Sequence, residues 1–259
     1  MKRALCLRFA AVSRSSPYKH KKLPAVLAGS AALFLFLETG MNYREIDLST
    51  YVRAEHFHYF RTLAYPYMGV TVDVDVTDFA AWCKQNGHSF YLGFMHLAAL
   101  AADTVEQFRH RIYKDGIIEI ESSTTSHVEL LENGTYCYCE LQHAEYAAWE
   151  RYFPYAEAQQ AACHDGSAPA TLQVDEMESL RSIFISCLPW LHYSALIQPA
   201  ACGDESNPRI TWGRFAKNSE GRLMMPLTVL LHHALADGLH MAQFYAEVER
   251  RLQEFSYGG

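Results

Sequence analysis

Hydrophobic and polar residues follow two periods along this chain, and these periods predict strands and helices. Valines stand at every second position from 70 to 76 between Thr and Asp residues, which is the pattern of a half-buried strand. The run from Leu223 to Leu231 is apolar apart from Thr228, as expected for a strand covered on both faces. After Gly238 the spacing of apolar residues is three or four, which predicts an amphipathic helix; they are Met241, Phe244, Tyr245, Val248, Leu252 and Phe255.

Other elements are predicted from periodicity together with turn residues. Thr77 or Asp78 can cap a helix that runs toward Gly87. Asp115-Gly116 can supply the positive dihedral angles of a tight hairpin turn within residues 111–118. Further helices are expected at 94–105 and 144–161, a loop around 165–169, a turn at 218–221, and strands at 136–141, 181–188, 192–198 and 209–215.

Strands with interspersed helices predict an α/β layered fold. The chain has 259 residues, half of them hydrophobic, which is enough for one substantial core. No internal repeat and no long Pro, Gly or Ser linker divides residues 41–259. We therefore expect a single domain over 41–259.

Residues 1–40 have a different composition, with seven Lys or Arg against Glu38 and a hydrophobic run from Leu23 to Leu37. That run is shorter than the roughly 20 residues of a membrane span, and Glu38-Thr39-Gly40 is a poor cleavage site. A signal peptide and a membrane anchor are alternatives. We favour an upstream extension, disordered or preceding a working start at Met41.

Charge and cysteine content exclude some classes of function. Residues 41–259 carry 15 basic and 28 acidic residues, net −13, which argues against nucleic-acid binding. No membrane association is expected for this part. Seven scattered cysteines without a CxxC motif are typical of reduced core thiols and of a cytoplasmic protein.

The stretch from His232 to Gly238 joins the last predicted strand to the last predicted helix. A neutral imidazole there can accept a proton near physiological pH, so one histidine is a candidate general base. Asp237 can support that base by pairing with a cation or with backbone N–H groups, and Gly238 permits a sharp turn. Ordinary packing is the alternative, and so is a zinc site, which is disfavoured because adjacent strand residues point to opposite faces.

His-His-x-x-x-Asp-Gly resembles the signature of CoA-dependent acyltransferases, and other segments resemble the chloramphenicol acetyltransferase family in particular. These segments follow one another in the family's order; they are Met41–Asp47, Val52–Phe57, Phe90-Tyr91, Lys114-Asp115-Gly116, Ser186-Cys187-Leu188-Pro189-Trp190 and Met225-Pro226-Leu227. The resemblance covers nearly all of residues 41–259. It implies a mixed β-sheet with helices, a homotrimer with active sites between subunits, and acetyl-CoA as co-substrate without a metal.

The resemblance also implies roles for individual residues. His233 matches the catalytic base, and His232 is its neighbour. Arg53 matches the arginine that pairs with the motif aspartate, Asp237, in a contact that suits a bidentate guanidinium. The two residues matching groups that stabilise the oxyanion of the tetrahedral intermediate are Ser186, a hydroxyl donor, and Thr211, an assisting residue.

Three segments depart from the family pattern, and they concern the acceptor pocket. Leu235-Ala236 replaces Val-Cys, Phe184-Ile185-Ser186-Cys187 replaces Asn-Ile-Ser-Ala, and residues 128–138 match poorly. Aromatic candidates for binding the acceptor are Tyr59, Phe60 and Tyr136.

The leading hypothesis is acetyl transfer to the hydroxyl of chloramphenicol or a similar small molecule, as expected for antibiotic resistance. A family member with another hydroxyl acceptor is the alternative. A non-catalytic oligomeric binding module is a third hypothesis, and the combination of a base with an oxyanion donor argues against it.

Overall fold

The computed structural model describes residues 42–166, 176–200 and 203–256, which all belong to one compact unit, Thr39–Gly259. The predictions for residues 1–40 and for the loop at 167–169 lie outside the described residues. The elements in chain order are β1 (Tyr43–Ile46), α1 (Ala54–Arg61), β2 (Tyr67–Asp75), α2 (Thr77–Asn86), α3 (Phe90–Asp103), η1 (Glu106–Phe108), β3 (His110–Tyr113), β4 (Gly116–Ile120), β5 (Thr124–Leu130), β6 (Tyr136–Gln142), η2 (Ala144–Tyr146), α4 (Trp149–His164), α5 (Glu176–Ser179), β7 (Ser182–Leu188), β8 (Arg209–Gly213), β9 (Ala216–Lys217), β10 (Leu223–His232), α6 (Gly238–Gln253) and η3 (Glu254–Ser256).

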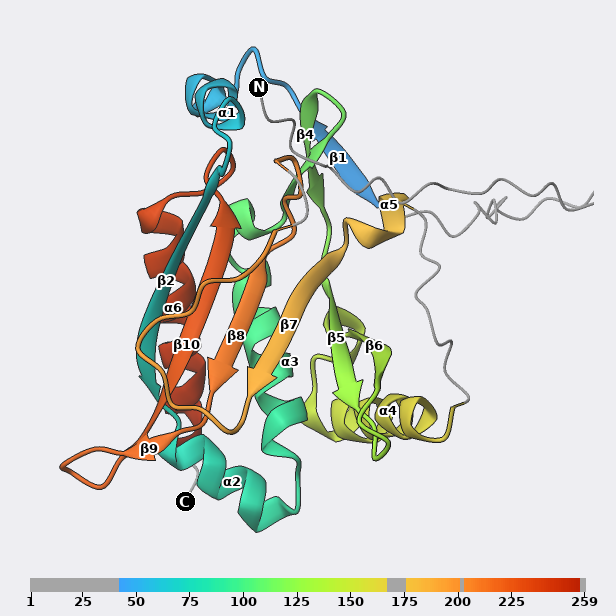
Figure 1. The fold of residues 1–259 in the computed structure, drawn as a ribbon, viewed down its shortest axis with the longest axis vertical. Coiled ribbons are helices and arrows are strands. Elements are labelled where there is room, and N and C mark those ends of the chain that lie inside the picture. Colours follow the sequence, from blue (N-terminus) through green and yellow to red (C-terminus); the bar gives the residue numbers. More distant parts are fainter. Residues whose placement is uncertain (1–41, 167–175, 201–202, 257–259) are drawn as a thin grey trace, which may run out of the picture. The chain divides into compact units, whose positions relative to one another are not determined.

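The main sheet has the strand order β2-β10-β8-β7-β5-β6, with β9 paired to β10, and a smaller sheet has the order β1-β4-β3. β7 runs parallel to β5 and β8, whereas β10 is antiparallel to β8 and β2. Figure 1 shows α3, α4 and α6 behind the main sheet. This arrangement confirms the predicted α/β class with a mixed sheet and helices.

The two faces of the main sheet differ in character. On β10, Met225, Leu227, Val229 and Leu231 belong to the buried core that also contains residues of α2, α3, α4 and α6. The alternate residues of β10 point to the other side, because successive side chains of a strand face opposite ways. We call that side the outward face. Figure 1 shows the segment after β7 crossing in front of it.

Residues 189–200, which we call the crossing segment, contain no strand, so the predicted strand at 192–198 is wrong. The Tyr193 side chain explains the difference, because its hydroxyl donates to Thr211 O at 3.0 Å and accepts from Thr228 Oγ1 at 3.2 Å. The apolar residues that suggested a strand are thus held over the sheet by side-chain bonds rather than by a backbone ladder.

The hairpin between β3 and β4 forms at the predicted place with a different turn. Gly116 is already paired with Tyr113, so the two loop residues are Lys114 and Asp115. The positive φ, 55°, falls on Lys114 instead of on the Asp-Gly pair. The hairpin signal was correct, but the residue assigned to the turn was shifted.

Two other predicted helices have different boundaries in the structure. α3 begins at Phe90, where Ser89 accepts a hydrogen bond from the backbone N–H of Leu92 at 3.4 Å. The helix expected at 144–161 is divided into η2 and α4. β1, α1 and β5 were not predicted. Among the described residues, no helix is long and apolar enough to span a membrane.

Candidate active site

The corner between β10 and α6 is fixed by short-range backbone bonds. The last residue of β10, His232, accepts at its carbonyl from Leu235 N at 3.0 Å and from Ala236 N at 3.3 Å. The next backbone N–H, that of His233, donates to Pro66 O at 2.7 Å. The corner is therefore tied both to itself and to the chain that enters β2.

His233 is held in one tautomer by the corner. Its Nδ1 lies 2.9 Å from Ala236 O, and because a carbonyl oxygen only accepts, Nδ1 carries the proton in this contact. Among the described residues Nε2 has no hydrogen-bond partner. The Phe60 ring stacks on the half-buried imidazole, with ring centroids 3.8 Å apart and an interplanar angle of 19°. The arrangement leaves the lone pair of Nε2 available to accept a proton.

His232 is occupied on both ring nitrogens. Nε2 donates to Gly203 O at 2.6 Å, and Nδ1 accepts from Ala234 N at 3.2 Å. The side chain is buried, and burial is the main cause that lowers its pKa, so the ring is neutral. Because neither ring nitrogen of His232 has a free lone pair, this side chain has a structural role in the corner.

Asp237 begins α6 as its N-cap residue. Its Oδ1 accepts from Leu239 N at 3.0 Å, and its own N–H donates to His240 Nδ1 at 3.0 Å. That ring nitrogen accepts because burial lowers the pKa of His240 and keeps the imidazole neutral. Two reciprocal bonds thus satisfy backbone donors at the helix start.

Arg53 pairs with Asp237 through a single nitrogen. Nη1 donates to Oδ2, while Nε and Nη2 are buried without a hydrogen-bond partner among the described residues. The expected bidentate geometry is therefore wrong, because Oδ1 is already engaged by the helix start. Burial raises the pKa of Asp237, but the bonds from Arg53 and Leu239 outweigh it, so its pKa is lowered and the carboxylate stays ionised.

Ser186 and Thr211 are neighbours on the outward face. They are register partners on β7 and β8, and the register continues from Thr211 to Thr228 on β10 and to Thr71 on β2. The four hydroxyl groups form a row across the sheet, which we call the hydroxyl row. Ser186 is exposed, whereas Thr211 is 1% exposed.

The corner and the hydroxyl row lie at different heights of the sheet. His233 is five residues beyond Thr228 along β10, which at about 3.4 Å per residue corresponds to roughly 17 Å. Ser186 is two strands further across. One chain therefore brings together His233, Asp237 and Arg53, and separately Ser186 and Thr211, but not the two groups.

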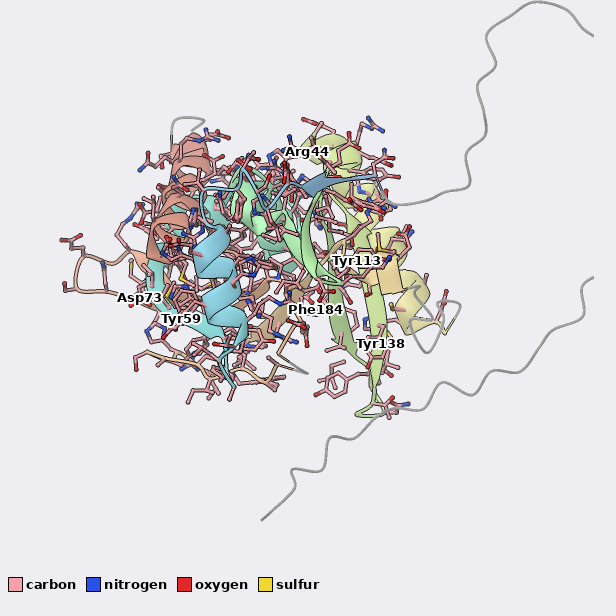
Figure 2. All side chains as sticks on the ribbon, turned by 90° about the horizontal axis from the view of Figure 1, so that it is seen from above. Arg44, Tyr59, Asp73, Tyr113, Tyr138 and Phe184 are labelled. Carbon is pink, nitrogen blue, oxygen red and sulfur yellow. The ribbon has the colours of Figure 1, made fainter. Side chains whose placement is uncertain are left out.

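The aromatic candidates divide in the same way. Phe60 contacts His233, and Tyr59 on α1 is 62% exposed. Tyr136 is on the edge strand β6 and is 59% exposed. Figure 2, in which Tyr59 and Tyr138 lie well apart, separates the two places.

An exposed apolar surface on β5 and β6 was missed by sequence reasoning. We call it the β5–β6 patch; its residues share the outward face and are Val128, Leu130, Tyr136 and Tyr138. Phe184, half-buried on the neighbouring β7, borders it. The period-two spacing of these residues was a usable signal, but only Tyr136 was singled out, as an aromatic candidate in the strand expected at 136–141, and residues 128–138 were otherwise treated as a poor match to the family.

One group among the described residues has the donor geometry for a metal ion. It consists of Glu106, His110 and Glu119, with donor atoms within 4.8 Å of one another. Glu119 already accepts from both Arg44 and Arg109. Because two guanidinium groups neutralise that carboxylate, we interpret the group as an ion-pair network.

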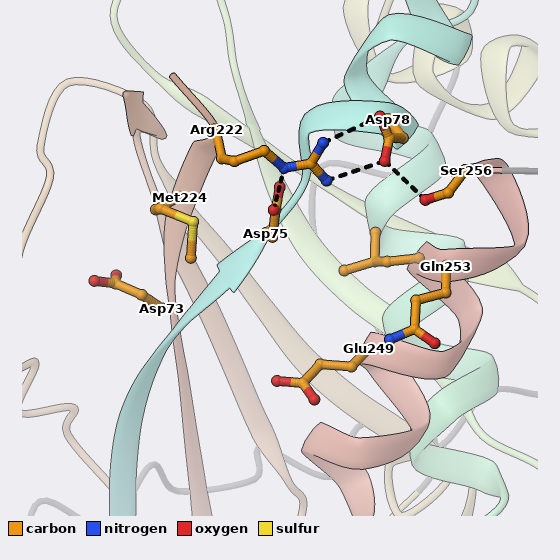
Figure 3. A pocket seen from close by; sticks show the side chains of 9 residues that line it. Asp73, Asp75, Asp78, Arg222, Met224, Glu249, Gln253 and Ser256 are labelled. Carbon is orange, nitrogen blue, oxygen red and sulfur yellow. Dashed lines mark hydrogen bonds and ion pairs between the residues drawn. The ribbon is translucent and has the colours of Figure 1, made fainter. Parts of the chain in front are cut away.

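Two further pockets lie away from the corner. One of about 250 Å³ is acidic, and Figure 3 shows its Arg222 bonded to Asp75 and Asp78, with Ser256 bonded to Asp78. The bonds of Arg222 join the residue before β10 to β2 and α2, and the bond of Ser256 joins η3 to α2. The other, of about 570 Å³, is mainly apolar and is bordered by basic side chains; they are Lys84, His88 and Lys217.

The mixed sheet, the histidine corner at the end of its last strand and the aspartate helix cap are the features that the resemblance to acyltransferases implied. The family model of chloramphenicol acetyltransferase matches residues 41–249, and the chain belongs to that family. A chloramphenicol acetyltransferase of Klebsiella sp is 29% identical over 217 residues, covering 83% of this chain and 96% of that relative. One of Streptomyces acrimycini is 27% identical over 219 residues, covering 81% and 94%.

Solved structures agree on the fold. A chloramphenicol acetyltransferase superposes with a TM-score of 0.71 at 23% identity, covering 82% of this chain and all of that one. The dihydrolipoamide acetyltransferase of Azotobacter vinelandii gives 0.56 at 15% identity, covering 77% and 86%. The family match confirms that this chain is an enzyme of the acyltransferase class, and the solved structures confirm its fold.

Proposed function

We propose that this protein transfers acetyl from acetyl-CoA to a hydroxyl group of chloramphenicol or of a similar small molecule. The observation that carries the proposal is the fixed tautomer of His233, with Nδ1 bonded to Ala236 O and Nε2 free. A neutral imidazole in this state is a general base, and a positioned base contributes about 10²- to 10⁴-fold in rate.

The reaction follows from these groups. Nε2 of His233 removes the acceptor hydroxyl proton as the oxygen attacks the thioester carbonyl, and the carbonyl oxygen becomes an oxyanion. Ser186 donates a hydrogen bond to that oxyanion, assisted by Thr211. The intermediate then expels the CoA thiolate, and the imidazolium returns its proton to the sulfur. These steps require no metal.

Asp237 and Arg53 support the base in this proposal. The pair joins the start of α6 to the residue that precedes α1. α1 carries Phe60, which stacks on His233, so the pair fixes both the helix start and the aromatic contact of the base.

We further propose that the active site forms between copies of the chain, as in a homotrimer. His233 and Ser186 are too far apart within one chain to act on the same acceptor. A neighbouring copy can supply the missing half, and the β5–β6 patch offers apolar surface that such a contact would cover.

Acetyl-CoA as donor agrees with the family and with the pocket between α2 and β9. Its apolar lining suits the adenine or pantetheine part, and Lys84, His88 and Lys217 offer positive or hydrogen-bonding groups for phosphates. A cytoplasmic location is part of the proposal, because free thiols are typical of a reducing compartment; those among the described residues are Cys83, Cys137, Cys139, Cys163 and Cys187.

A different hydroxyl acceptor is the second candidate, and Phe184 favours it. This ring lies two residues before Ser186 on the same face of β7, and the Arg209 guanidinium lies 4.9 Å from its centroid. A bulky ring beside the oxyanion donor narrows the space for the acceptor. Fast CoA release with another alcohol and slow release with chloramphenicol would favour this candidate.

The test of the function is the release of CoA thiol by the full recombinant chain with acetyl-CoA and chloramphenicol. His233→Ala is expected to lower kcat by at least about 100-fold with an unchanged far-UV spectrum. Turnover equal to that of the wild type in this variant would refute the mechanism. Tight binding of acetyl-CoA with no turnover over a broad panel of alcohols would favour a binding module instead.

Assembly between copies has its own test. His233→Ala and Ser186→Ala chains, each inactive alone, are co-refolded in equal amounts. A shared site takes His233 from one copy and Ser186 from the neighbouring copy. In a random mixture both groups are intact in about one of four sites, so about a quarter of the wild-type activity is expected. No recovery in mixed oligomers verified by mass would contradict a shared site.

A further inference from the structure

The crossing segment is clamped to the outward face at the hydroxyl row. Tyr193 bonds to Thr211 O and Thr228 Oγ1, as described above. Gly213 allows the close approach, because a Cβ there would lie 2.5 Å from Leu191 O and 2.8 Å from the Tyr193 ring. The position of this segment relative to β8 is thus fixed by contacts on both sides of Thr211.

Gln198 extends from this segment onto Thr211. Its Nε2 donates to Thr211 Oγ1, and its Oε1 is buried without a hydrogen-bond partner among the described residues. Tyr65 OH donates to the Gln198 carbonyl at 3.5 Å, which ties the residue toward the start of β2. The amide is therefore held in place by backbone anchoring and by one side-chain bond, the bond to Thr211.

This bond determines what the Thr211 hydroxyl can do. A hydroxyl has one proton and two lone pairs. Because one lone pair accepts from Gln198, the proton of Thr211 is directed away from the amide. Ser186 is the register partner of Thr211 on β7 and lies on the same face. The proton of Thr211 is thus free to point toward Ser186, the side where the oxyanion forms in the proposed reaction.

We propose that Gln198 is a positioning residue that makes Thr211 a hydrogen-bond donor in acetyl transfer. The inference rests on the proposed function, in which Ser186 and Thr211 stabilise the oxyanion. Gln198 does not touch the reacting atoms. The Gln198 amide donates to one lone pair of the Thr211 hydroxyl. Without this hydrogen bond the hydroxyl would be free to rotate.

The experiment compares two substitutions that weaken the donor by different routes. Gln198→Leu removes the amide and lets the hydroxyl rotate, so a loss in kcat of roughly 5-fold is expected with an unchanged KM for the acceptor. Gln198→Glu introduces an ionised carboxylate, which accepts only, so Thr211 must donate to it. A larger loss, roughly 50-fold, is expected near neutral pH.

A pH profile separates this role from a packing role. When the introduced carboxyl becomes protonated at low pH, it can donate again, so the ratio of Gln198→Glu to wild-type kcat is expected to rise as pH falls. In a Thr211→Val background, both Gln198 substitutions are expected to cause no further loss. Ser194→Ala, an exposed change in the same segment, serves as the matched control and is expected to leave kcat unchanged.

Each outcome bears on one proposal only. Equal losses for Leu and Glu, a pH-independent ratio, or full additivity with Thr211→Val would overturn the role of Gln198. If wild-type protein transfers no acetyl group to any alcohol, the proposed function fails. In that case a thermal-shift measurement still tests the contact itself, since Gln198→Glu and Gln198→Leu should then differ in stability only when Thr211 is present.

Discussion

The corner after β10 and the hydroxyl row are built by different kinds of contact. In the corner, His233 is oriented by a carbonyl three residues away, and Asp237 caps a helix that begins at the next residue. In the hydroxyl row, Ser186, Thr211 and Thr228 stand on three strands that are distant in sequence and are aligned only by register. The orientation of His233 and the cap of α6 are local in sequence, although Arg53, Phe60 and Pro66 also contact the corner, whereas the hydroxyl row depends on the register of the whole sheet.

The difference matches what each group has to do in the proposed reaction. A base needs one ring in one tautomer, and a tight turn can supply this by itself. A donor to the oxyanion must face a substrate that, in the proposed site, is also held by another copy of the chain. Its position therefore depends on the sheet, on the crossing segment and on the contact between copies.

The largest effect predicted for the hydroxyl row concerns Ser186, its exposed member. Ser186→Ala removes an exposed hydroxyl that has no hydrogen bond to the rest of the described chain, so the melting temperature is expected to stay unchanged. Loss of one oxyanion donor costs about 3 kcal/mol, so kcat is expected to fall roughly 100-fold. Fixed-time assays of CoA thiol release measure kcat, and thermal unfolding measures the melting temperature. A lowered melting temperature with normal kcat would mean that Ser186 is structural.

The corner and the hydroxyl row can be compared only while the protein stays folded. We expect low pH to destabilise the folded state. His96 and His143 are buried together, with their Nδ1 atoms 3.0 Å apart. Burial lowers the pKa of His96 to about 4, whereas an unfolded histidine titrates near about 6.5. Between these values only the unfolded state gains a proton at this site. The free energy of unfolding is therefore highest above pH 6.5 and falls toward pH 4, by about 3 kcal/mol for His96 alone.

Urea unfolding at several pH values between 7.5 and 4.5 measures this loss. His96→Gln is expected to reduce the slope of unfolding free energy against pH, since one titrating group is removed. His88→Gln, at a residue outside this pair, is the control. If the slope is the same in His96→Gln and in the wild type, His96 does not titrate as inferred.

Local patterns were sufficient to predict the corner. The apolar run of β10, the spacing of α6 and the motif between them gave the strand, the helix and the position of His233, because each depends on neighbours in sequence. The structure also has Arg53 paired to Asp237, 184 residues away. That pair was expected only from the family resemblance, since an arginine in a polar stretch is more often a solvated charge.

Long-range contacts account for the errors. The crossing segment has the composition of a strand, but Tyr193 and Gln198 bind it across the sheet, and Gly213 permits this approach. β5 was overlooked because its buried face contains polar residues such as Thr125 and His127, which break the expected apolar alternation. In both places the deciding partner lies on another strand, which no local pattern reports.

The smallest predicted effects test how far the corner depends on Arg53. Asp237→Asn keeps a good N-cap residue but removes the charge that Arg53 meets, and Asp237→Ala removes both. The difference between the two variants in unfolding free energy is expected to be about 1 kcal/mol, the usual contribution of a cap.

Arg53→Ala combined with Asp237→Asn is expected to show a coupling of about 1–2 kcal/mol, because the arginine is largely buried. Arg44→Ala is the matched control, since its side chain is 73% exposed and such pairs contribute about 0–1 kcal/mol. Additive losses for Arg53 and Asp237 would show that the corner is stable without this ion pair. The corner would then depend on local contacts alone, unlike the hydroxyl row.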